Sequence, residues 1–285
     1  MIDISAHSNS GDIIEINSLD NKTIVRKRIF KSIDRAELSI KKQQSFEGIS
    51  VGSDSRIEAV KIIEVHRYEN CLEILMPYVE GVVAADYSLK GTKSIGENVS
   101  KSLSLILYHE LASSVDAVLD LNFIKSKIIE IKENTLASDY KYFFSKTCDF
   151  LDAIEEDIVY PSGPCHGDLT LSNIILSTGG GVKLIDFLDS YIETPLQDVA
   201  KIRQEFDFLW SFRKLDEPSR IKAKIFCANF FPRAVIDMER IYPLASRIFS
   251  HMALIRICPY VKDGVTKEWL INSLNVSMKK LKDSL

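Results

Sequence analysis

The sequence has 285 residues, which is enough for one large domain or two lobes with a sizeable hydrophobic core. Its apolar share of 46% and its charged share of 27% are ordinary for a globular protein. The net charge of −4, without any basic run, argues against nucleic acid as the main partner and gives no reason to expect binding to a membrane surface.

The cysteines and the apolar runs predict a cytoplasmic protein. The five cysteines are widely spaced and no Cys-x-x-Cys pair occurs, so neither a zinc site nor a disulfide framework is expected. Reduced, buried thiols are the expected state in the cytoplasm. No apolar run approaches the roughly 20 residues of a membrane span. Residues 1–9 lack the apolar core of a signal peptide.

The first 80 residues are predicted to form mostly β-strands. Residues 23–30 are rich in β-branched side chains, and a turn at 18–21 separates them from an earlier apolar run. The predicted elements are strands over 12–16, 23–30, 58–65 and 71–76, and a helix over 34–46 with Asp34 as its cap.

The second part of the chain is predicted to be helical. Apolar residues recur at helical spacing between residues 98 and 121, and a second helix covers 140–154. A Pro/Gly-rich stretch at 160–164 ends this second helix. Further helices are expected from Asp198 onward and over 267–281.

A polar loop and a predicted hairpin lie between these helices. The loop covers residues 166–173 and reads HGDLTLSN. Two short apolar runs, 174–176 and 182–185, flank the Gly-rich turn 178–181, which is a hairpin signal. The second strand of this hairpin returns Asp186 to the neighbourhood of the loop.

Three side chains of this stretch suit phosphoryl transfer from a nucleotide. That reaction needs hard oxygen ligands for Mg²⁺ and a carboxylate that orients or deprotonates the attacking hydroxyl. Asp186 and Asn173 fit the metal ligands, and Asp168 fits the base. The alternative is a chance polar loop before an ordinary hairpin. A His-Gly-Asp triplet alone would favour that alternative, whereas the full set at this spacing argues against it.

The spacing His-x-Asp-x-x-x-x-Asn, followed by a strand that ends in Ile-Asp-Phe, resembles the catalytic loop and metal-binding Asp of protein-kinase-like enzymes. Gly167 inside the triplet, and Asp186-Phe187-Leu188-Asp189 where protein kinases have Asp-Phe-Gly, are similar to the aminoglycoside phosphotransferase and choline kinase superfamily of small-molecule kinases. The resemblance covers nearly the whole chain, but its specific part is residues 166–198.

The resemblance implies an α+β, bilobal, protein-kinase-like fold with ATP in the cleft. A small antiparallel-sheet N-lobe over residues 1–80 would bind the nucleotide. A larger, mostly helical C-lobe over residues 81–285 would carry the catalytic loop and the acceptor site.

The same resemblance implies a set of nucleotide contacts. Lys27 is similar to the strand Lys that holds the α- and β-phosphates. Arg26 is one alternative, because neighbouring residues of a strand face opposite ways and only one of the two can point into the cleft. A second alternative is that Arg26, Lys27 and Arg28 are all solvated cations on an edge strand. The stretch 75–81 resembles the hinge that reads the adenine edge. A Ser/Gly stretch at 8–11 resembles the loop over the phosphates, although it also reads as an ordinary turn. The implied nucleotide contacts are Ser10, Lys27, Met76, Pro77 and Val79.

Four further residues are expected to support the site. Glu37 shares the inward stripe of its helix and would pair with the strand Lys, with a solvated Glu37 as the alternative. His166 would buttress the loop, and Asp198 would hold that loop and start a helix. Asp189 has three open roles: a carboxylate that supports the metal site without touching the ion, a second metal ligand, or a solvated turn residue.

The predicted function is transfer of the γ-phosphate of ATP, or of another nucleoside triphosphate, to a hydroxyl of a small molecule such as a sugar or an amino alcohol, with Mg²⁺ as cofactor. No acidic cluster indicates a polycationic antibiotic as acceptor. One alternative is a catalytically silent pseudokinase that binds nucleotide or acts as a scaffold. Another is a kinase of protein side chains, which the missing Asp-Phe-Gly and Ala-Pro-Glu sequences disfavour.

Overall fold

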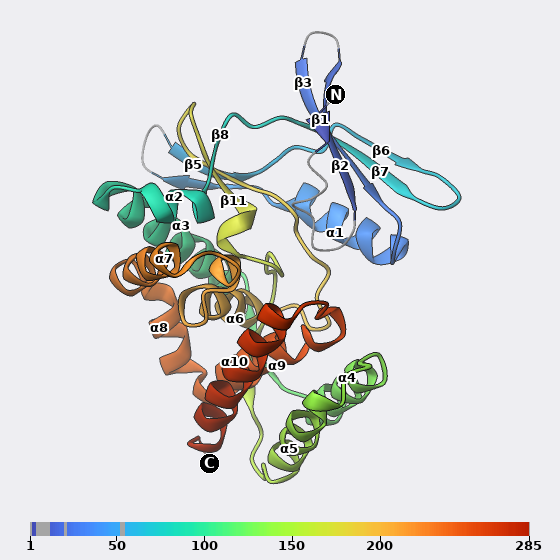
Figure 1. Cartoon of the computed structure of the whole chain (residues 1–285), viewed down its shortest axis with the longest axis vertical. Helices are drawn as coiled ribbons and strands as arrows, with labels where there is room; N and C mark the ends of the chain where they lie inside the picture. Colours follow the sequence, from blue (N-terminus) through green and yellow to red (C-terminus); the bar gives the residue numbers. More distant parts are fainter. Residues whose placement is uncertain (1, 4–11, 20–21, 52–54, 285) are drawn as a thin grey trace. The chain divides into compact units, whose positions relative to one another are not determined.

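The computed structural model describes residues 2–3, 12–19, 22–51 and 55–284 (Figure 1). Ser10, an expected nucleotide contact, lies outside these residues. The chain forms two compact units. Unit 1 comprises Met1–Asp86 and His166–Tyr191, and unit 2 comprises Tyr87–Cys165 and Ile192–Leu285. The predicted lobe boundary at residue 80 stays a prediction, and the loop and hairpin that follow His166 fold together with the strand-rich N-terminal part.

An antiparallel sheet forms the first part of unit 1. Its strands follow the order β1 (Ile2–Asp3), β2 (Ile13–Leu19), β3 (Lys22–Ile29), β7 (Leu72–Pro77) and β6 (Glu64–Arg67). The strands predicted over 12–16, 23–30 and 71–76 are thereby confirmed. Because β3 has a neighbour on each side, Lys27 lies opposite Ile14 on β2 and opposite Ile74 on β7.

Helix α1 (Ile33–Ser45) packs against one face of this sheet (blue in Figure 1). Ile33, Ala36 and Ile40 lie on one side of the helix and contact the apolar cluster that includes Ile74 of β7. The predicted helix over 34–46 is confirmed within a residue at each end. Asp34 lies in the first turn and does not cap the helix.

A second sheet in unit 1 holds the predicted hairpin. Its order is β4 (Ile49–Val51), β5 (Ser55–Ala59), β12 (Val182–Leu184), β11 (Ile174–Ser177) and β8 (Gly81–Val83). The hairpin β11–β12 is antiparallel, β12 runs parallel to β5, and β11 pairs with β8. Both outer edges of the hairpin are therefore hydrogen-bonded, which fixes the segments that enter and leave it.

The hairpin turn requires glycine at two positions. Gly180 and Gly181 have φ angles of 85° and 80°, in the left-handed region that glycine adopts without steric cost. A Cβ atom on Gly181 would lie 2.5 Å from the carbonyl oxygen of Arg56. The turn thus lets the backbone of β5 approach closely.

The continuous strand predicted over residues 58–65 is wrong. β5 ends at Ala59 and β6 begins at Glu64, and the two strands belong to different sheets. Val60 and Ile62, between them, are buried in the core of unit 1. The chain crosses from one sheet to the other through this apolar core. The apolar residues at 60 and 62 therefore mark a buried connection and not the continuation of a strand.

Unit 2 is mainly helical. Short helix α2 (Ala84–Lys90) leads into it, and its helices are α3 (Lys93–Ala112), α4 (Leu121–Glu133), α5 (Lys141–Asp152), α6 (Pro195–Phe206), α7 (Glu217–Asn229), α8 (Arg233–Ile241), α9 (Pro243–Ile255) and α10 (Gly264–Lys282). Short 3₁₀ helices cover Ser138–Tyr140, Trp210–Phe212 and Cys258–Tyr260, and a further one, Leu171–Asn173, lies in unit 1. Helix α9 contacts both α6 and α10. The helices predicted over 140–154 and 267–281 are confirmed.

The helix predicted to extend to residue 121 is wrong beyond Ala112. Residues Val115–Val118 form β9, which pairs antiparallel with β10 (Val159–Ser162). Val115 and Val118 are 72% and 57% exposed, so they belong to no helical core face despite their spacing. β-Branched valines suit the extended backbone that the pairing with β10 stabilises.

Disulfides and membrane-spanning helices, neither of which the sequence predicts, are also absent from the described residues. All five cysteines lie in this part of the chain, and none of them forms a disulfide. Among the helices of the described ranges, none is both long and apolar enough to cross a membrane.

His251 is a fully buried polar residue at the packing of α5, α9 and α10. Its Nε2 lies 2.9 Å from Oγ1 of Thr147, and its Nδ1 lies 3.0 Å from Oγ of Ser277. Thr147 donates its hydroxyl to the carbonyl oxygen of Phe143. Nε2–H therefore donates to Thr147, and Nδ1 accepts from Ser277, which is the neutral imidazole. Burial lowers the pKa of His251 to about 4.

This pKa predicts a specific loss of stability in acid. The unfolded histidine takes up a proton below about pH 6.5, whereas the folded one resists until about pH 4, so folding stability falls as the pH drops between these values. Denaturant unfolding at pH 7.5 and pH 5 should show that His251→Gln removes about 2 kcal/mol of the pH-dependent loss seen in the wild type. Identical losses in the two proteins would contradict a neutral, buried His251.

Candidate active site

Lys27 of β3 and Asp186, two residues beyond β12, meet within unit 1. The Lys27 Nζ donates to Oδ1 of Asp186 at 2.9 Å and lies 3.6 Å from Oδ2 of Asp12. The Lys27 side chain is only 14% exposed. The Asp186 side chain is 38% exposed, so water still reaches the carboxylate side of this ion pair and screens the attraction in part.

Strand alternation decides which cation of β3 faces Asp186. Lys27 shares its face of the strand with Val25 and Ile29, which pack on the core shared with α1. Arg26 and Arg28 lie on the opposite face, where both approach Glu73 of β7, at 3.6 and 2.8 Å. The structure thus places Lys27, and not Arg26, beside Asp186, and β3 is not an edge strand. The phosphate-binding role of Lys27 stays a prediction.

The Lys27 ammonium stays charged although it is buried. Burial alone would lower the pKa of Lys27, but the charges and hydrogen bonds of Asp186 and Asp12 outweigh burial and hold the pKa above its ordinary value. The site therefore presents a fixed cation beside a carboxylate.

Asp12 is a neighbour of Lys27 that the sequence reasoning missed. It directly precedes β2 and is 8% exposed. Ile14, two residues later, is the cross-strand partner of Lys27. Residues two positions away from a cross-strand partner lie on the same face and within reach of a long side chain. Once β2 and β3 are aligned, this diagonal relation is the signal that points to Asp12.

The predicted pair between Glu37 and Lys27 does not form. Oε1 of Glu37 accepts from Nη1 of Arg67 at 2.5 Å, and Nη2 of Arg67 also donates to Asp34 at 3.1 Å. The buried side of α1 is mostly apolar and ends with Gln43. Glu37 lies at the margin of this side, and its carboxylate faces Arg67 of the exposed strand β6. Glu37 thus matches neither prediction: it is paired with Arg67 at the edge of the unit, not with Lys27 and not with water alone.

His166 fixes the backbone on both sides of the loop. Its Nδ1 accepts the backbone N–H of Asp168 at 3.2 Å, so its Nε2–H donates to the carbonyl oxygen of Ile185 at 2.9 Å. Its ring also lies against that of Phe187, with centroids 4.2 Å apart. These contacts fit a buttressing role and use both ring nitrogens.

Gly167 is required by a close backbone approach. Its φ is 86°, and a Cβ atom there would lie 2.2 Å from the carbonyl oxygen of Leu188. The Leu188 N–H in turn donates to the carbonyl oxygen of His166 at 2.9 Å. A side chain at position 167 would force the loop away from the segment that follows Asp186.

Asn173 orients Asp168. Its Nδ2 donates both to the carbonyl oxygen of Asp168 at 2.8 Å and to Oδ2 of Asp168 at 2.9 Å. The carbonyl oxygen of Asn173 accepts the N–H of Ile185 at 3.1 Å, which ties the loop to β12. The hydrogen bonds seen for the Asn173 amide in the described residues use its nitrogen, which leaves Oδ1 as the atom that can meet a cation.

The carboxylate of Asp186 and the amide oxygen of Asn173 suit Mg²⁺ better than a metal bound entirely by protein side chains. Across the described ranges, no group of three or more His, Cys, Asp or Glu side chains could hold a metal ion. Mg²⁺ is usually bound by one or two carboxylates together with water and phosphate oxygens. A carboxylate from Asp186 and an amide oxygen from Asn173 are hard ligands of that kind.

The structure gives Asp189 and Asp198 different surroundings. Asp189 forms an ion pair with Arg35 of α1 at 3.0 Å, so it is no solvated turn residue. Asp198 belongs to unit 2, is fully buried, and lies in the first turn of α6. That helix is capped by Thr194 and begins at Pro195, ahead of Asp198. The expected hold of Asp198 on the catalytic loop stays a prediction.

The three hinge candidates lie at and just beyond the end of β7. Met76 is buried, and its sulfur is 3.8 Å from Nε2 of Gln43. Pro77 ends the strand opposite Ile24, and Val79 packs against the core cluster of unit 1. Their contacts with a nucleotide stay predictions.

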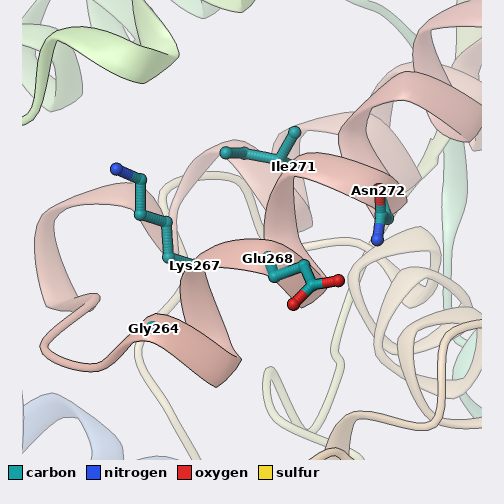
Figure 2. A pocket seen from close by; sticks show the side chains of 5 residues that line it. All are labelled: Gly264, Lys267, Glu268, Ile271 and Asn272. Carbon is teal, nitrogen blue, oxygen red and sulfur yellow. The ribbon is translucent and has the colours of Figure 1, made fainter.

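A hollow in unit 2 offers no comparable chemistry. It lies along α10 and is lined by Gly264, Lys267, Glu268, Ile271 and Asn272 (Figure 2). Figure 2 shows the Lys267 ammonium and the Glu268 carboxylate pointing away from each other, and Lys267 is paired with Asp139 at 2.9 Å. The lining comes from a single helix, so it does not surround a ligand.

Comparisons with known proteins agree with the motif analysis. The APH family model, described as the phosphotransferase enzyme family, matches residues 126–231, which include the whole loop and hairpin. No curated protein sequence matches the chain.

Three solved structures share the fold. A thermostable mutant of the aminoglycoside phosphotransferase APH(4)-Ia is 12% identical with a TM-score of 0.55, over 99% of this chain and 92% of that one. A complex of the same enzyme with ADP and hygromycin B is 11% identical with a TM-score of 0.55, at the same coverage. Choline kinase LicA from Streptococcus pneumoniae is 15% identical with a TM-score of 0.51, over 97% of this chain and 91% of that one.

The chain therefore has a protein-kinase-like α+β fold, with an antiparallel sheet in its N-terminal part and a mostly helical C-terminal part. The family model over residues 126–231 and the shared fold of these structures agree with the resemblance to aminoglycoside phosphotransferases and choline kinases predicted from the motif.

The geometry predicts which partner of Lys27 is energetically coupled to it. In double-mutant cycles, Lys27→Met and Asp186→Asn should show a coupling of at least about 1 kcal/mol in unfolding free energy, because the two groups are in contact. Lys27→Met and Glu37→Gln should add within about 0.5 kcal/mol, because Glu37 contacts Arg67 instead. Chemical denaturation of the single and double variants measures both. A larger coupling to Glu37 than to Asp186 would contradict the observed pairing.

Proposed function

We propose that this protein transfers the γ-phosphoryl group of a nucleoside triphosphate, ATP in the first place, to a hydroxyl group of a small molecule. The observation that carries the proposal is the meeting of Lys27 with Asp186 in the same unit that holds the Asp168–Asn173 pair. Because its proposed donor is a cytoplasmic metabolite, the proposal also places the protein in the cytoplasm.

Asp168 is the proposed base. It is half-buried, and Asn173 fixes one of its carboxylate oxygens. A carboxylate held in this way can accept the proton of a substrate hydroxyl as the oxygen attacks the γ-phosphorus. The His166 ring holds the Asp168 backbone and is already hydrogen-bonded at both nitrogens, so it acts as a support and not as the base.

Lys27, Asp186 and Asn173 are the proposed phosphate and metal residues. Lys27 would bind the α- and β-phosphates, because its ammonium stays charged within a mostly buried site. Asp186 and Asn173 would hold Mg²⁺, which when bound neutralises phosphate charge during the transfer. Since the phosphoryl transition state is loose, positioning and charge neutralisation supply most of the rate.

The related structures support a small-molecule acceptor. One is described as an aminoglycoside phosphotransferase in complex with ADP and hygromycin B, and another as a choline kinase. For this chain we propose a sugar, an amino alcohol or another hydroxylated metabolite. A polycationic antibiotic is not proposed, because the C-terminal part mixes acidic and basic residues without an acidic cluster.

One observation favours a second candidate, a nucleotide-binding pseudokinase. Glu37 is paired with Arg67, so the pair of helix Glu and strand Lys that kinase-like enzymes use is not formed. Against this candidate, the chain keeps all three of Asp168, Asn173 and Asp186, together with Lys27. Turnover, tested separately from binding, distinguishes the two.

Nucleotide binding is the first test. A nucleotide at about 100 times its dissociation constant stabilises a protein by roughly 2.7 kcal/mol, which raises the midpoint of thermal unfolding by a few degrees at this size. We expect such a shift with ATP and Mg²⁺ for the wild type, and its loss in Asp186→Ala. Differential scanning fluorimetry with ATP and GTP, each with and without Mg²⁺, measures the shift.

The matched control for that test is Asp152→Ala, which removes a 62% exposed carboxylate in unit 2. It should keep the full nucleotide-dependent shift. A wild type without any shift, or an Asp186→Ala variant with an unchanged one, would refute the proposed nucleotide site.

Asp168→Asn separates chemistry from binding. The new amide oxygen can still accept from Asn173, so fold and nucleotide shift should be retained. Release of nucleoside diphosphate with a hydroxylated acceptor should fall by about 10²- to 10⁴-fold, the usual contribution of a general base. A screen of sugars and amino alcohols by coupled assay supplies the acceptor, and turnover close to that of the wild type in the variant would rule out Asp168 as the base.

A further inference from the structure

The segment that follows Asp186 is held by helix α1. Arg35, Ser39 and Lys42 occupy positions i, i+4 and i+7 of the helix, so their side chains project along one face. All three contact Leu188 or Asp189. This polar face lies beside the apolar stripe that packs on the sheet.

Asp189 uses its backbone and its side chain on α1. Nε of Arg35 donates to Oδ2 of Asp189 at 3.0 Å, and Nη2 of Arg35 donates to the carbonyl oxygen of Asp189 at 3.0 Å. The Asp189 N–H donates to Oγ of Ser39 at 2.8 Å. The carbonyl oxygen of Leu188, the residue before Asp189, accepts a hydrogen bond from Nζ of Lys42 at 2.9 Å. The Asp189 carboxylate is thus engaged by a guanidinium in this structure.

The catalytic loop holds the same segment from its other side. The ring of Phe187 lies against His166 and against Phe46, with centroids 4.2 and 5.6 Å apart. Leu188 donates its N–H to the His166 carbonyl oxygen, and its own carbonyl oxygen passes close to Gly167. The three residues after Asp186 are therefore fixed between the loop and α1.

Asp186 itself needs this support. Its φ is 58°, in the left-handed region that costs free energy for a residue other than glycine. Such a conformation persists only where the surroundings over-determine it. The contacts of Arg35, Ser39 and Lys42 fall on the two residues that begin two positions after Asp186, so they restrain the backbone that leaves this conformation.

We propose that Asp189 is a positioning residue, held by Arg35, which fixes the left-handed turn at Asp186 and so sets the affinity of the site for Mg²⁺ with nucleotide. The inference rests on the proposed function and answers the open question of the role of Asp189. In this proposal, helix α1 supports the proposed metal-binding turn at Asp186 through Arg35, and Glu37 has no part in it.

The test is the Mg²⁺ concentration that gives half of the ATP-dependent thermal shift. Arg35→Ala and Asp189→Ala should each raise this concentration about tenfold, which corresponds to the loss of one charge-assisted hydrogen bond. The double variant should require no more Mg²⁺ than Arg35→Ala alone, because that change already removes both contacts of the guanidinium with Asp189. Arg35→Lys keeps the charge but loses one of the two hydrogen bonds to Asp189, so its Mg²⁺ requirement should lie between those of the wild type and Arg35→Ala. The unfolding midpoint without ligand should change by no more than a few degrees, because the pair is partly exposed.

The matched control is Lys41→Ala, which removes an exposed charge from another face of α1. It should leave the Mg²⁺ requirement unchanged. An unchanged requirement in Arg35→Ala and Asp189→Ala, an equal rise in Lys41→Ala, or effects that multiply in the double variant would overturn the inference. Complete loss of the Mg²⁺ response in Asp189→Ala alone would make Asp189 a metal ligand instead. A wild type without any Mg²⁺-dependent shift would refute the proposed function as well.

Discussion

The contact between Lys27 and Asp186 is the interaction on which the rest of unit 1 depends. Burial alone would lower the pKa of a lysine that is 14% exposed, yet two carboxylates hold the pKa of Lys27 above the ordinary value. The pair joins β3 of one sheet to the segment that leaves β12 of the other. Without the Lys27 ammonium, the carboxylates of Asp12 and Asp186 would both lose the cation that they share.

The second sheet stabilises the hairpin that leads to Asp186. An isolated two-stranded hairpin is marginally stable, whereas this one pairs with β5 and β8 on its outer edges. The loop before it is tied to the same strand through Asn173 and through the His166 ring. Asp168, Asn173 and Asp186 are therefore held by hydrogen bonds of the His166 ring, the Asn173 amide and Lys27, next to a hairpin that is paired on both edges.

The parts of the site that could be predicted from sequence are those that local patterns decide. Apolar runs around three glycines are enough to predict the hairpin. Alternation on β3 shows only that Lys27 and Arg26 face opposite ways, and the packing of Val25 and Ile29 on the core is needed to tell which of the two faces Asp186. Glu37 could not be placed, because its helix position allows either the core margin or Arg67, and only tertiary packing selects between them. Asp12 needs the register of β2 against β3. The strand at 115–118 was hidden because two valines matched a helical period, and its pairing partner lies about forty residues later in the chain.

The different surroundings of Glu37 and Arg35 have a common origin in the geometry of α1. Ile33, Ala36, Ile40 and Gln43 bury one side of the helix, and the two flanks of that stripe face different neighbours. One flank carries Glu37 towards β6, and the other carries Arg35, Ser39 and Lys42 towards the segment after Asp186. A rotation of α1 that brought Glu37 to Lys27 would move the second flank as well. In this fold, therefore, α1 cannot bring Glu37 to Lys27 without also changing its contacts with the segment that follows Asp186.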